Sequence, residues 1–577
     1  MNSNAPFCIK RYKTMLLSAA ITTAVGILVL LSDSIISGFL INEKAVAALT
    51  VINPIYLLLT FLSLMVTTGL EIIFPYEVGK MNLQRANEFF SMSCIISLFL
   101  GILFFFFILF FSELFFSYMG IGGEVLEYAR AYISIIKWVY LIIPISETIG
   151  LMVYVDGDEL VSNISSIYLI IGNIGSSLTL TYFFGISGVA YGTLIGYLGH
   201  LIISVLHFFR KTCSLKFSWY FSFKDLMHLS KFSIVDSILF FLMGIVSFVV
   251  QKIILSNYGD EYIPAFSVMI TVIELSYVFD CVGSATSPIL SVFRGENNSV
   301  GIKSIFISSV KTALLIGFIA GVIVFFAAPL FPMLYGIESS EIYDISVKAV
   351  RIVSLSMFPI SFLYIITSYY LSIEKIALST FITVLRDLIP NLVCVFIFNK
   401  IFKMTGIWIG FAVGPWIAVV ISFVLVKLIY KNQNFPYLIQ NRDSDIFTWS
   451  FYIDDKASTE ISQKAAEIMK KRNINPKSII KVSLLIEEGL LLIKEKNPDK
   501  KVYAECTIFF EEKIKVIFRD DGIIFDMTDA DSEVSSFRSF FVSSLMEHYS
   551  DKAHLITTSY DRNVFGETVV SKSVIEI

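Results

Sequence analysis

The sequence has few charged residues, and those it has nearly cancel. Only 16% of the 577 residues are Asp, Glu, Lys or Arg, and the formal net charge at pH 7 is -4. Proteins that bind nucleic acid through its phosphates carry a basic surface, so this balance excludes nucleic acid as an expected partner. In contrast, 56% of the residues are hydrophobic and the mean hydropathy is +0.75. A chain this apolar cannot fold as one water-soluble globule, and we expect it to lie in a lipid bilayer.

Cysteine is also scarce, and its spacing excludes two common uses. The six cysteines are scattered and form no CxxC pair: Cys8, Cys94, Cys213, Cys281, Cys394 and Cys506. A disulfide framework or a structural zinc site would need them in clusters. We therefore interpret them as buried or inert thiols and expect no metal site built from cysteine.

Long apolar runs are abundant. Twelve of them, each about 20 residues or longer, have the length of a membrane-spanning helix. They lie near residues 14–40, 46–78, 89–111, 128–154, 160–184, 188–210, 228–256, 262–292, 303–326, 346–371, 377–399 and 404–431. Basic residues such as Lys80, Arg85 and Arg210 gather in alternate loops, and the opposite loops are acidic. The positive-inside rule therefore predicts that both termini lie in the cytoplasm of a bacterial cell, with the chain integral to the cytoplasmic membrane.

The apolar runs fall into two sets of six that share a small-residue pattern. Four residues of the first half recur in the second half, each at the same distance along the sequence. Gly188, Gly192, Gly196 and Asn173 correspond to Gly406, Gly410, Gly414 and Asn391. Duplicated halves are typical of transporters with a site between two bundles. We interpret the glycine spacing as close approach of helices within each bundle. The sequence thus predicts an all-α membrane region of twelve helices in two repeated six-helix bundles, residues 1–215 and 216–435.

The order of residues in the first two runs resembles that of the multidrug and toxic compound extrusion (MATE) family. The matching residues are Asp33, Ala47-Ala48, Pro54, Gly69 and Glu77-Val78-Gly79-Lys80. The second half has a corresponding pattern, Ser287-Pro288-Ile289 followed by Arg294-Gly295-Glu296-Asn297. The resemblance covers about residues 10–431. It implies a secondary exporter, which is not an enzyme.

Asp33 is the acidic residue that most needs an explanation. An ionisable group at the centre of a bilayer costs several kcal/mol, and Asp33 has no Lys or Arg within one helical turn. The resemblance makes it a ligand for a proton or a sodium ion, with Asn173, Ser177 and Thr193 as companions. Many members of the family have a second Asp at the position of Ser177. The alternative is that Asp33 faces a water-filled cavity and couples nothing.

Other acidic residues in the apolar runs suggest how a substrate is held. Glu274 is the one that we expect to contact a cationic substrate, with a helix–helix contact as the alternative; Glu147, Asp236 and Asp280 are further acids. Aromatic residues make up 15% of the chain, which suits amphipathic or cationic organic compounds. We predict a cation-coupled exporter of such small molecules, driven by protons or sodium, with membrane lipid around it.

Two alternatives to drug export remain open. A flippase for a lipid-linked saccharide would need a basic cavity for the pyrophosphate, and the predicted helix interiors offer little more than Lys137, Arg351 and Arg386. Because Arg386 and Asp387 are adjacent, we do not expect them to face each other on one helical stripe, although each can lower the insertion cost of the other. The other alternative is a membrane sensor that signals through the residues after the last run.

Residues 445–577 are mixed in charge and lack a membrane-length apolar run. We predict a separate cytoplasmic α+β sandwich domain with its helices on one face of the sheet. The expected elements are strands at 447–453, 503–510, 514–519, 554–560 and 567–575, and helices at 459–472, 476–495 and 535–548.

Two motifs in this domain resemble the ATP-binding domain of histidine kinases and anti-sigma-factor kinases. The resemblance gives Glu488 the task of polarising water or a substrate hydroxyl, Asp520 that of accepting the adenine amino group, and Gly522 that of admitting the base. Leu492 stands where the family has a magnesium-binding Asn, and the glycine-rich lid is replaced by Ser536-Phe537-Arg538-Ser539-Phe540-Phe541. A phosphate cradle of backbone N–H groups needs glycine conformations. We therefore expect no cofactor and no kinase or ATPase activity, and interpret the domain as regulatory or as a docking platform for a cytoplasmic protein, with residual ATP binding as the alternative.

Overall fold

The computed structural model describes residues 7–79, 82–156, 158–210, 213, 215–431, 435–440, 443–510, 514–523, 552–555, 562–563, 566–567 and 571–576. The chain forms two compact units. The tail unit consists of Met1–Ala20, Val282–Lys311 and Val426–Ile577, and the helical unit consists of Ile21–Cys281 and Thr312–Leu425.

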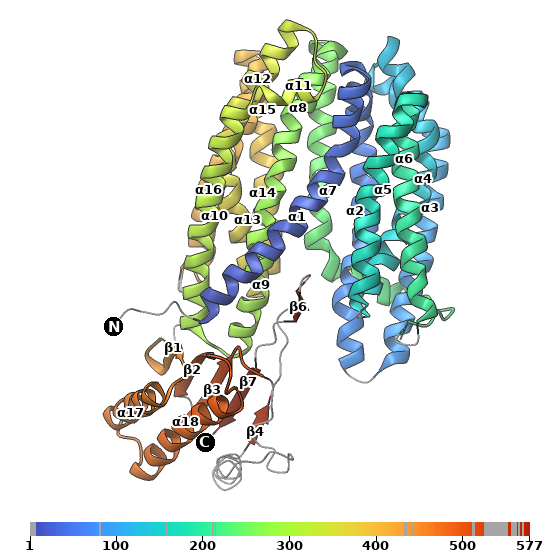
Figure 1. Cartoon of the computed structure of the whole chain (residues 1–577). Helices are drawn as coiled ribbons and strands as arrows, with labels where there is room; N and C mark the ends of the chain where they lie inside the picture. Colours follow the sequence, from blue (N-terminus) through green and yellow to red (C-terminus); the bar gives the residue numbers. More distant parts are fainter. Residues whose placement is uncertain are drawn as a thin grey trace. The chain divides into compact units, whose positions relative to one another are not determined.

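Helices dominate the chain up to residue 429, and each predicted apolar run is helical (Figure 1). They are α1 (Phe7–Leu40), α2 (Glu43–Gly79), α3 (Leu83–Met119), α4 (Gly123–Val155), α5 (Glu159–Phe184), α6 (Ile186–Val205), α7 (Phe223–Asn257), α8 (Ile263–Leu275), α9 (Asp280–Gly295), α10 (Ser299–Ala327), α11 (Leu330–Leu334), α12 (Ser340–Ser354), α13 (Met357–Ser372), α14 (Ile376–Asp387), α15 (Ile389–Phe402) and α16 (Met404–Ile429). Within the described ranges, ten spans are long and apolar enough to cross a membrane, or eleven if α12 and α13, bent by 46°, form one. The arrangement as twelve spans in two bundles therefore stays a prediction.

Polar caps and one left-handed glycine set the ends of several helices. The Asn82 side chain accepts a hydrogen bond from the backbone N–H of Arg85 (3.1 Å) at the start of α3, which ends at Gly120 with φ of 79°. Asp158 caps α5 and Ser222 caps α7 in the same way. Such side chains satisfy N–H groups that have no partner within the helix, which fixes where each helix begins.

The two glycine ladders lie at corresponding helix contacts. A Cβ atom on Gly192 of α6 would lie 2.4 Å from the backbone nitrogen of Ser177 in α5. A Cβ atom on Gly410 of α16 would lie 2.6 Å from the backbone nitrogen of Val395 in α15. Figure 1 shows α5 and α6 side by side. The predicted close approach of helices at both ladders is confirmed, because only glycine leaves room for the neighbouring backbone.

The halves of the helical unit meet where α2 packs against α7. The side chain of Gln251 in α7 is buried and donates hydrogen bonds to the Thr50 carbonyl (2.8 Å) and to Ser247 (2.7 Å). Gln251 stands where the second half would repeat Asp33, and here it joins two helices. All six cysteines are free thiols; five are buried, as predicted, and Cys213 is half-buried.

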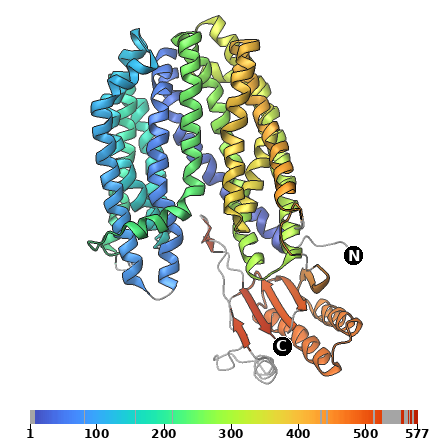
Figure 2. The same ribbon diagram turned by 180° about the vertical axis from the view of Figure 1, so that it is seen from behind.

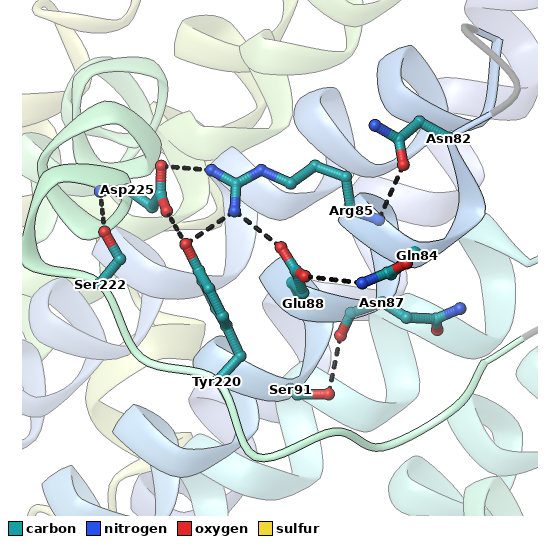
Figure 3. A network of polar contacts seen from close by, with 9 residues as sticks. All are labelled: Asn82, Gln84, Arg85, Asn87, Glu88, Ser91, Tyr220, Ser222 and Asp225. Carbon is teal, nitrogen blue, oxygen red and sulfur yellow. Dashed lines mark hydrogen bonds and ion pairs between the residues drawn. The ribbon is translucent and has the colours of Figure 1, made fainter.

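The linker between the halves is fixed to α3 by a polar network (Figure 3). Arg85 donates to Glu88, to the Tyr220 hydroxyl and to Asp225, each at 2.7 Å. Tyr220 also donates to Asp225. Burial acts to raise the pKa of the Asp225 carboxyl, but the hydrogen bonds from Tyr220 and Arg85 outweigh it and hold this pKa below its usual range. The segment that leads into α7 is therefore tied to the start of α3.

The tail unit contains a five-stranded antiparallel sheet of order β1-β2-β3-β7-β4. Its strands are β1 (Ile446–Tyr452), β2 (Tyr503–Phe510), β3 (Ile514–Asp520), β4 (Lys552–Leu555) and β7 (Ser571–Glu576), and β5 (Arg562–Asn563) pairs with β6 (Gly566–Glu567). Helices α17 (Asp455–Lys471) and α18 (Pro476–Glu495) lie along one face (Figure 1, Figure 2). The α+β sandwich is as predicted up to residue 520. The predicted helix at 535–548 lies outside the described residues, as does most of the strand at 554–560.

Side chains alternate between the two faces of this sheet. Ala504, Cys506 and Phe518 join the apolar core under α17 and α18. On the opposite face, Phe509 and Ile517 pack with Val300 of α10. Both faces are therefore covered within the tail unit, the first by its own helices and the second by the turn between α9 and α10.

The same second face carries a buried charge cluster. Arg519 donates to Glu505 of β2 and to Glu296 in the α9–α10 turn, and all three side chains are buried. Near the edge of the sheet, the Phe7 ring at the start of α1 stacks on Tyr503 with centroids 5.9 Å apart. The two carboxylates hold the guanidinium from both sides, which gives the contact between strand and turn a fixed register.

Candidate functional site: an acidic, tyrosine-lined cavity

A cavity of about 770 Å³ lies within the helical unit. Helices from both halves of the sequence line it. Seven tyrosines contribute to the lining: Tyr56, Tyr132, Tyr140, Tyr197, Tyr277, Tyr335 and Tyr364. The charged lining residues are four acids and one base: Asp33, Glu147, Glu274, Asp280 and Arg386. Electron-rich ring faces and carboxylates both attract cations, so the cavity has the chemistry of a site for organic cations.

Asp33 faces this cavity from α1, and two of its three predicted companions lie with it. Thr193 of α6 donates a hydrogen bond to Asp33 Oδ2 (2.9 Å), and the Tyr132 hydroxyl of α4 donates to the same oxygen (3.1 Å). Asn173 of α5 also lines the cavity and accepts a hydrogen bond from Ser32 (3.4 Å). The second carboxylate oxygen of Asp33 is buried and has no hydrogen-bond partner among the described residues. This arrangement leaves one oxygen of Asp33 for a proton or a cation.

Ser177, the third predicted companion, lies elsewhere. Its hydroxyl donates to the carbonyl of Val189 in α6 (3.3 Å), next to Gly192, and it is not among the residues that line the cavity. The structure therefore places Ser177 in the α5–α6 contact. Its short side chain lets the glycine ladder pack, and its position gives no support to a role as cation ligand.

Glu274 of α8 and Glu147 of α4 both line the cavity, and the expected contact of Glu274 with a cationic substrate stays a prediction. Asn53 lies within hydrogen-bonding reach of Glu274, and Tyr197 has the same relation to Glu147. We did not assign Glu147 to the site from the sequence. The sequence did indicate Glu147, because a carboxylate inside an apolar run is costly to bury and is therefore a candidate functional residue. The tyrosines gave no such signal, because aromatic residues are spread throughout the membrane region.

Arg386 and Asp387 pair with each other although they are adjacent in the sequence, which fits the expectation that each lowers the insertion cost of the other. Two guanidinium nitrogens of Arg386 donate to the two carboxylate oxygens of Asp387 at 2.8 and 2.7 Å. The reason is a helix break: α14 ends at Asp387, and Pro390 in the first turn of α15 has no N–H to bond the Arg386 carbonyl. The side chain of Asn391 donates to that carbonyl instead (2.9 Å). Asn391 therefore completes the break between α14 and α15.

The part of the sequence that matches a known family includes most of the helices that line the cavity. The family model MatE matches residues 18–183 and 233–397, one segment in each half of the membrane region. The chain belongs to the MatE family. Its members are transporters and not enzymes, so this MATE chain is an integral membrane transporter.

Solved structures share the fold of this MATE chain at low sequence identity. An inward-facing multidrug resistance MATE family transporter of the MOP superfamily is 18% identical, with a TM-score of 0.66, and the match covers 72% of this chain and 97% of that one. An outward-facing structure matches with 20% identity, a TM-score of 0.58 and coverage of 73% and 95%. A MOP superfamily transporter from Pyrococcus furiosus, whose binding pocket is described as having reverse polarity, matches with 19% identity, a TM-score of 0.60 and coverage of 73% and 95%. No curated protein matches the sequence.

The predicted nucleotide residues of the MATE chain lie in its tail unit. The carboxylate of Asp520 is buried and accepts a hydrogen bond from the backbone N–H of Gly522 (2.9 Å). Glu488 is half-buried on α18, and Leu492 is fully buried in the core beneath it. The lid at 536–541 lies outside the described residues. Asp520 and Gly522 thus form a turn, and the likeness to an ATP-binding domain stays a prediction.

Proposed function

We propose that this MATE chain is a cation-coupled secondary exporter of small cationic, amphipathic organic compounds, working by alternating access in the cytoplasmic membrane. The observation that carries the proposal is the lining of the cavity, in which four carboxylates face seven tyrosines. Its volume is in the range of about 300–1,000 Å³ that suits drug-sized ligands. A cation in it gains from the ring faces as well as from the acids.

Coupling in this proposal rests on competition for negative charge. Asp33 and Glu274 line the same cavity, so a proton or sodium ion on Asp33 lowers the attraction for a cationic substrate. By linkage, the substrate lowers the affinity for the ion by the same factor. Thr193 and Asn173 supply neutral oxygens beside Asp33, which suits a sodium ion as well as a proton. An inward ion gradient then drives the substrate outward.

The test is export of a dye cation such as ethidium from reconstituted vesicles under an imposed gradient. Asp33→Asn should abolish export driven by the coupling ion and leave dye binding in place, since Glu274, Glu147 and the tyrosines remain. Separate proton and sodium gradients identify the ion. Glu113→Gln is the matched control, because Glu113 is an exposed acid of α3 that pairs only with Arg130 among the described residues. Undiminished gradient-driven export by Asp33→Asn would contradict the coupling role.

The charge of the cavity disfavours a flippase for lipid-linked saccharides. A pyrophosphate needs unpaired basic groups, whereas Arg386 is already neutralised by Asp387. Neither Lys137 nor Arg351 is among the lining residues. The acids would repel the pyrophosphate at any position in the cavity.

We further propose that the tail domain regulates the exporter without catalysis. Arg519, Phe509 and Ile517 present a sheet face to the α9–α10 turn, so the domain contacts a loop that joins two membrane helices. Asp443 adds a hydrogen bond from Ser299 (2.7 Å) and an ion pair with Lys303 at the start of α10. A ligand or protein that changes the tail can act on transport through this contact.

A further inference from the structure

A cluster of side chains without a role in the proposed transport mechanism lies where the α4–α5 turn meets the start of the linker between the two halves. His207, in the short 3-10 helix Leu206–Phe209, is buried between two carboxylates. Its Nε2 lies 2.7 Å from Asp156 Oδ2, and its Nδ1 lies 2.9 Å from Asp158 Oδ2. All of these side chains belong to the helical unit.

A neutral imidazole cannot satisfy both contacts. It carries one N–H donor and one acceptor, and ionised carboxylates only accept. Asp158 also accepts hydrogen bonds from Arg210 (3.1 Å) and from the backbone N–H of Val161 (3.3 Å), which hold it beside Nδ1. With the ring proton on Nδ1, the lone pair of Nε2 faces an acidic oxygen. A second cation must lie at this contact, and it is either another proton or a metal ion.

Cys213 brings a third possible ligand atom to this contact, which favours the metal ion. Its sulfur, the His207 ring nitrogen and an Asp156 oxygen all lie within 4.8 Å of one another. Bonds of about 2.0–2.3 Å to a tetrahedral zinc ion place its ligand atoms roughly 3.3–3.8 Å apart. To bind zinc, the Nε2–Oδ2 pair would open by about 0.6 Å, and any pair of ligand atoms near the 4.8 Å limit would close by about 1 Å. The Cys213 thiol donates to the Leu215 carbonyl (3.7 Å), a contact that the thiolate of a bound ion would give up.

We propose that Asp156, His207 and Cys213 form a zinc site at this junction, with Asp158 orienting the histidine from behind. One nitrogen, one oxygen and one sulfur ligand suit zinc, and a water completes a tetrahedron. A carboxylate on the far ring nitrogen of a ligating histidine fixes its tautomer and raises its basicity. The sequence concealed the site, because its ligands are spread over three segments and only one is a cysteine.

The position of the site suggests what the ion holds together. Asp156 follows α4, whereas Cys213 belongs to the linker that leads to α7. Further along the same linker, the backbone N–H of Lys216 donates to Asn87 (2.7 Å) and that of Ser218 to Ser91 (2.8 Å). Zinc would thus fasten the beginning of a linker whose end is already tied to α3.

The experiment uses the full chain without a polyhistidine tag, purified in detergent, stripped with a chelator and titrated with Co²⁺ as the probe. We expect one Co²⁺ per chain, a thiolate-to-cobalt charge-transfer band in the near ultraviolet, and displacement of the cobalt by Zn²⁺. Cys213→Ser should remove the band, and Asp156→Asn should weaken binding. Asp158→Asn should keep the band and weaken affinity by roughly 10–100-fold.

Cys94→Ser is the matched control, because Cys94 is a buried thiol of α3 outside the cluster. It should keep both the band and the affinity. Cys213 is half-buried, so its serine variant should fold even if Asp156→Asn, which changes a hydrogen-bond partner of the buried His207, does not. Absence of cobalt uptake by the wild-type chain, or a band that persists in Cys213→Ser, overturns the proposal and leaves an imidazolium as the cation between the carboxylates.

Discussion

Single charged residues in the helical unit differ mainly in whether they have a partner. Arg386 and Asp387 neutralise each other, whereas one oxygen of Asp33 has no partner among the described residues. The cost of an unpaired charge in an apolar region allowed Asp33 and Glu274 to be selected from the sequence. It could not reveal that Ser177 is turned away, because the direction of a side chain on a helix depends on which helix packs against it.

At the end of the linker, Asp225 gives a prediction on pH. The pKa of its carboxyl is held low in the folded chain, so its contribution to stability is complete above the unfolded pKa of about 3.9 and is lost as the pH falls through the folded pKa. Asp225→Asn should therefore lower the melting temperature by a constant amount from pH 7 to about pH 5, and this difference should shrink below about pH 4. Fluorescence-detected melting of both chains across the pH range checks it. A difference that grows on acidification would contradict the ionised pairing with Arg85.

Among the secondary-structure elements, the helix pairs of the two halves show how far the sequence determines packing. The glycine ladders predicted the α5–α6 and α15–α16 contacts, because a repeated small residue has few other reasons to occur at that spacing. The break between α14 and α15 was missed, although Pro390 was a signal for it. An apolar run hides such a break, since its hydropathy is unchanged when the helix ends and restarts.

The glycine contacts give a prediction in which two similar substitutions have opposite effects. Gly192→Ala places a methyl group against the backbone of Ser177 and should destabilise the fold by about 1–3 kcal/mol, because that backbone has to move. Gly175→Ala, on the facing helix α5, meets no atom within 4 Å. It should stabilise the helix by about 0.5–1 kcal/mol, as alanine is favoured over glycine in helices. Thermal unfolding in one detergent compares them, and equal effects would refute the close contact.

At the level of the whole molecule, the chain joins a membrane transporter to a C-terminal sheet domain, which packs on the turn between α9 and α10. The abrupt change in composition after Lys431 was enough to predict this domain and most of its strands. Its docking was not predictable, because Arg519, Glu505 and Glu296 look like ordinary surface charges until the sheet aligns them. The kinase-like motif likewise predicts what the domain resembles, but it does not predict which face of the sheet packs against the α9–α10 turn.

The regulatory proposal for the tail makes its prediction at this level. Glu296→Gln removes one of the two carboxylates around Arg519 and should weaken docking by about 1–3 kcal/mol, the value of a hydrogen bond to a charged group. We expect faster hydrogen exchange in residues 296–303 and an altered rate of dye export, with ion coupling retained.

Glu460→Gln tests whether the docking face itself matters. It makes the same change of charge on α17, on the other face of the sheet, where Glu460 pairs with Lys464. It should leave both the exchange and the export rate unchanged. If the two variants behave alike, the docked face has no role in transport.

The burial of the native thiols has a practical consequence for following transport. Five of the six are shielded by packing, so Cys213→Ser alone should leave a background that reacts slowly with maleimides and spin labels. Pairs of reporter cysteines introduced at exposed helix ends could then be labelled selectively. Distances between them, measured by electron paramagnetic resonance in vesicles, would test whether the cavity opens and closes as ions and dye are added.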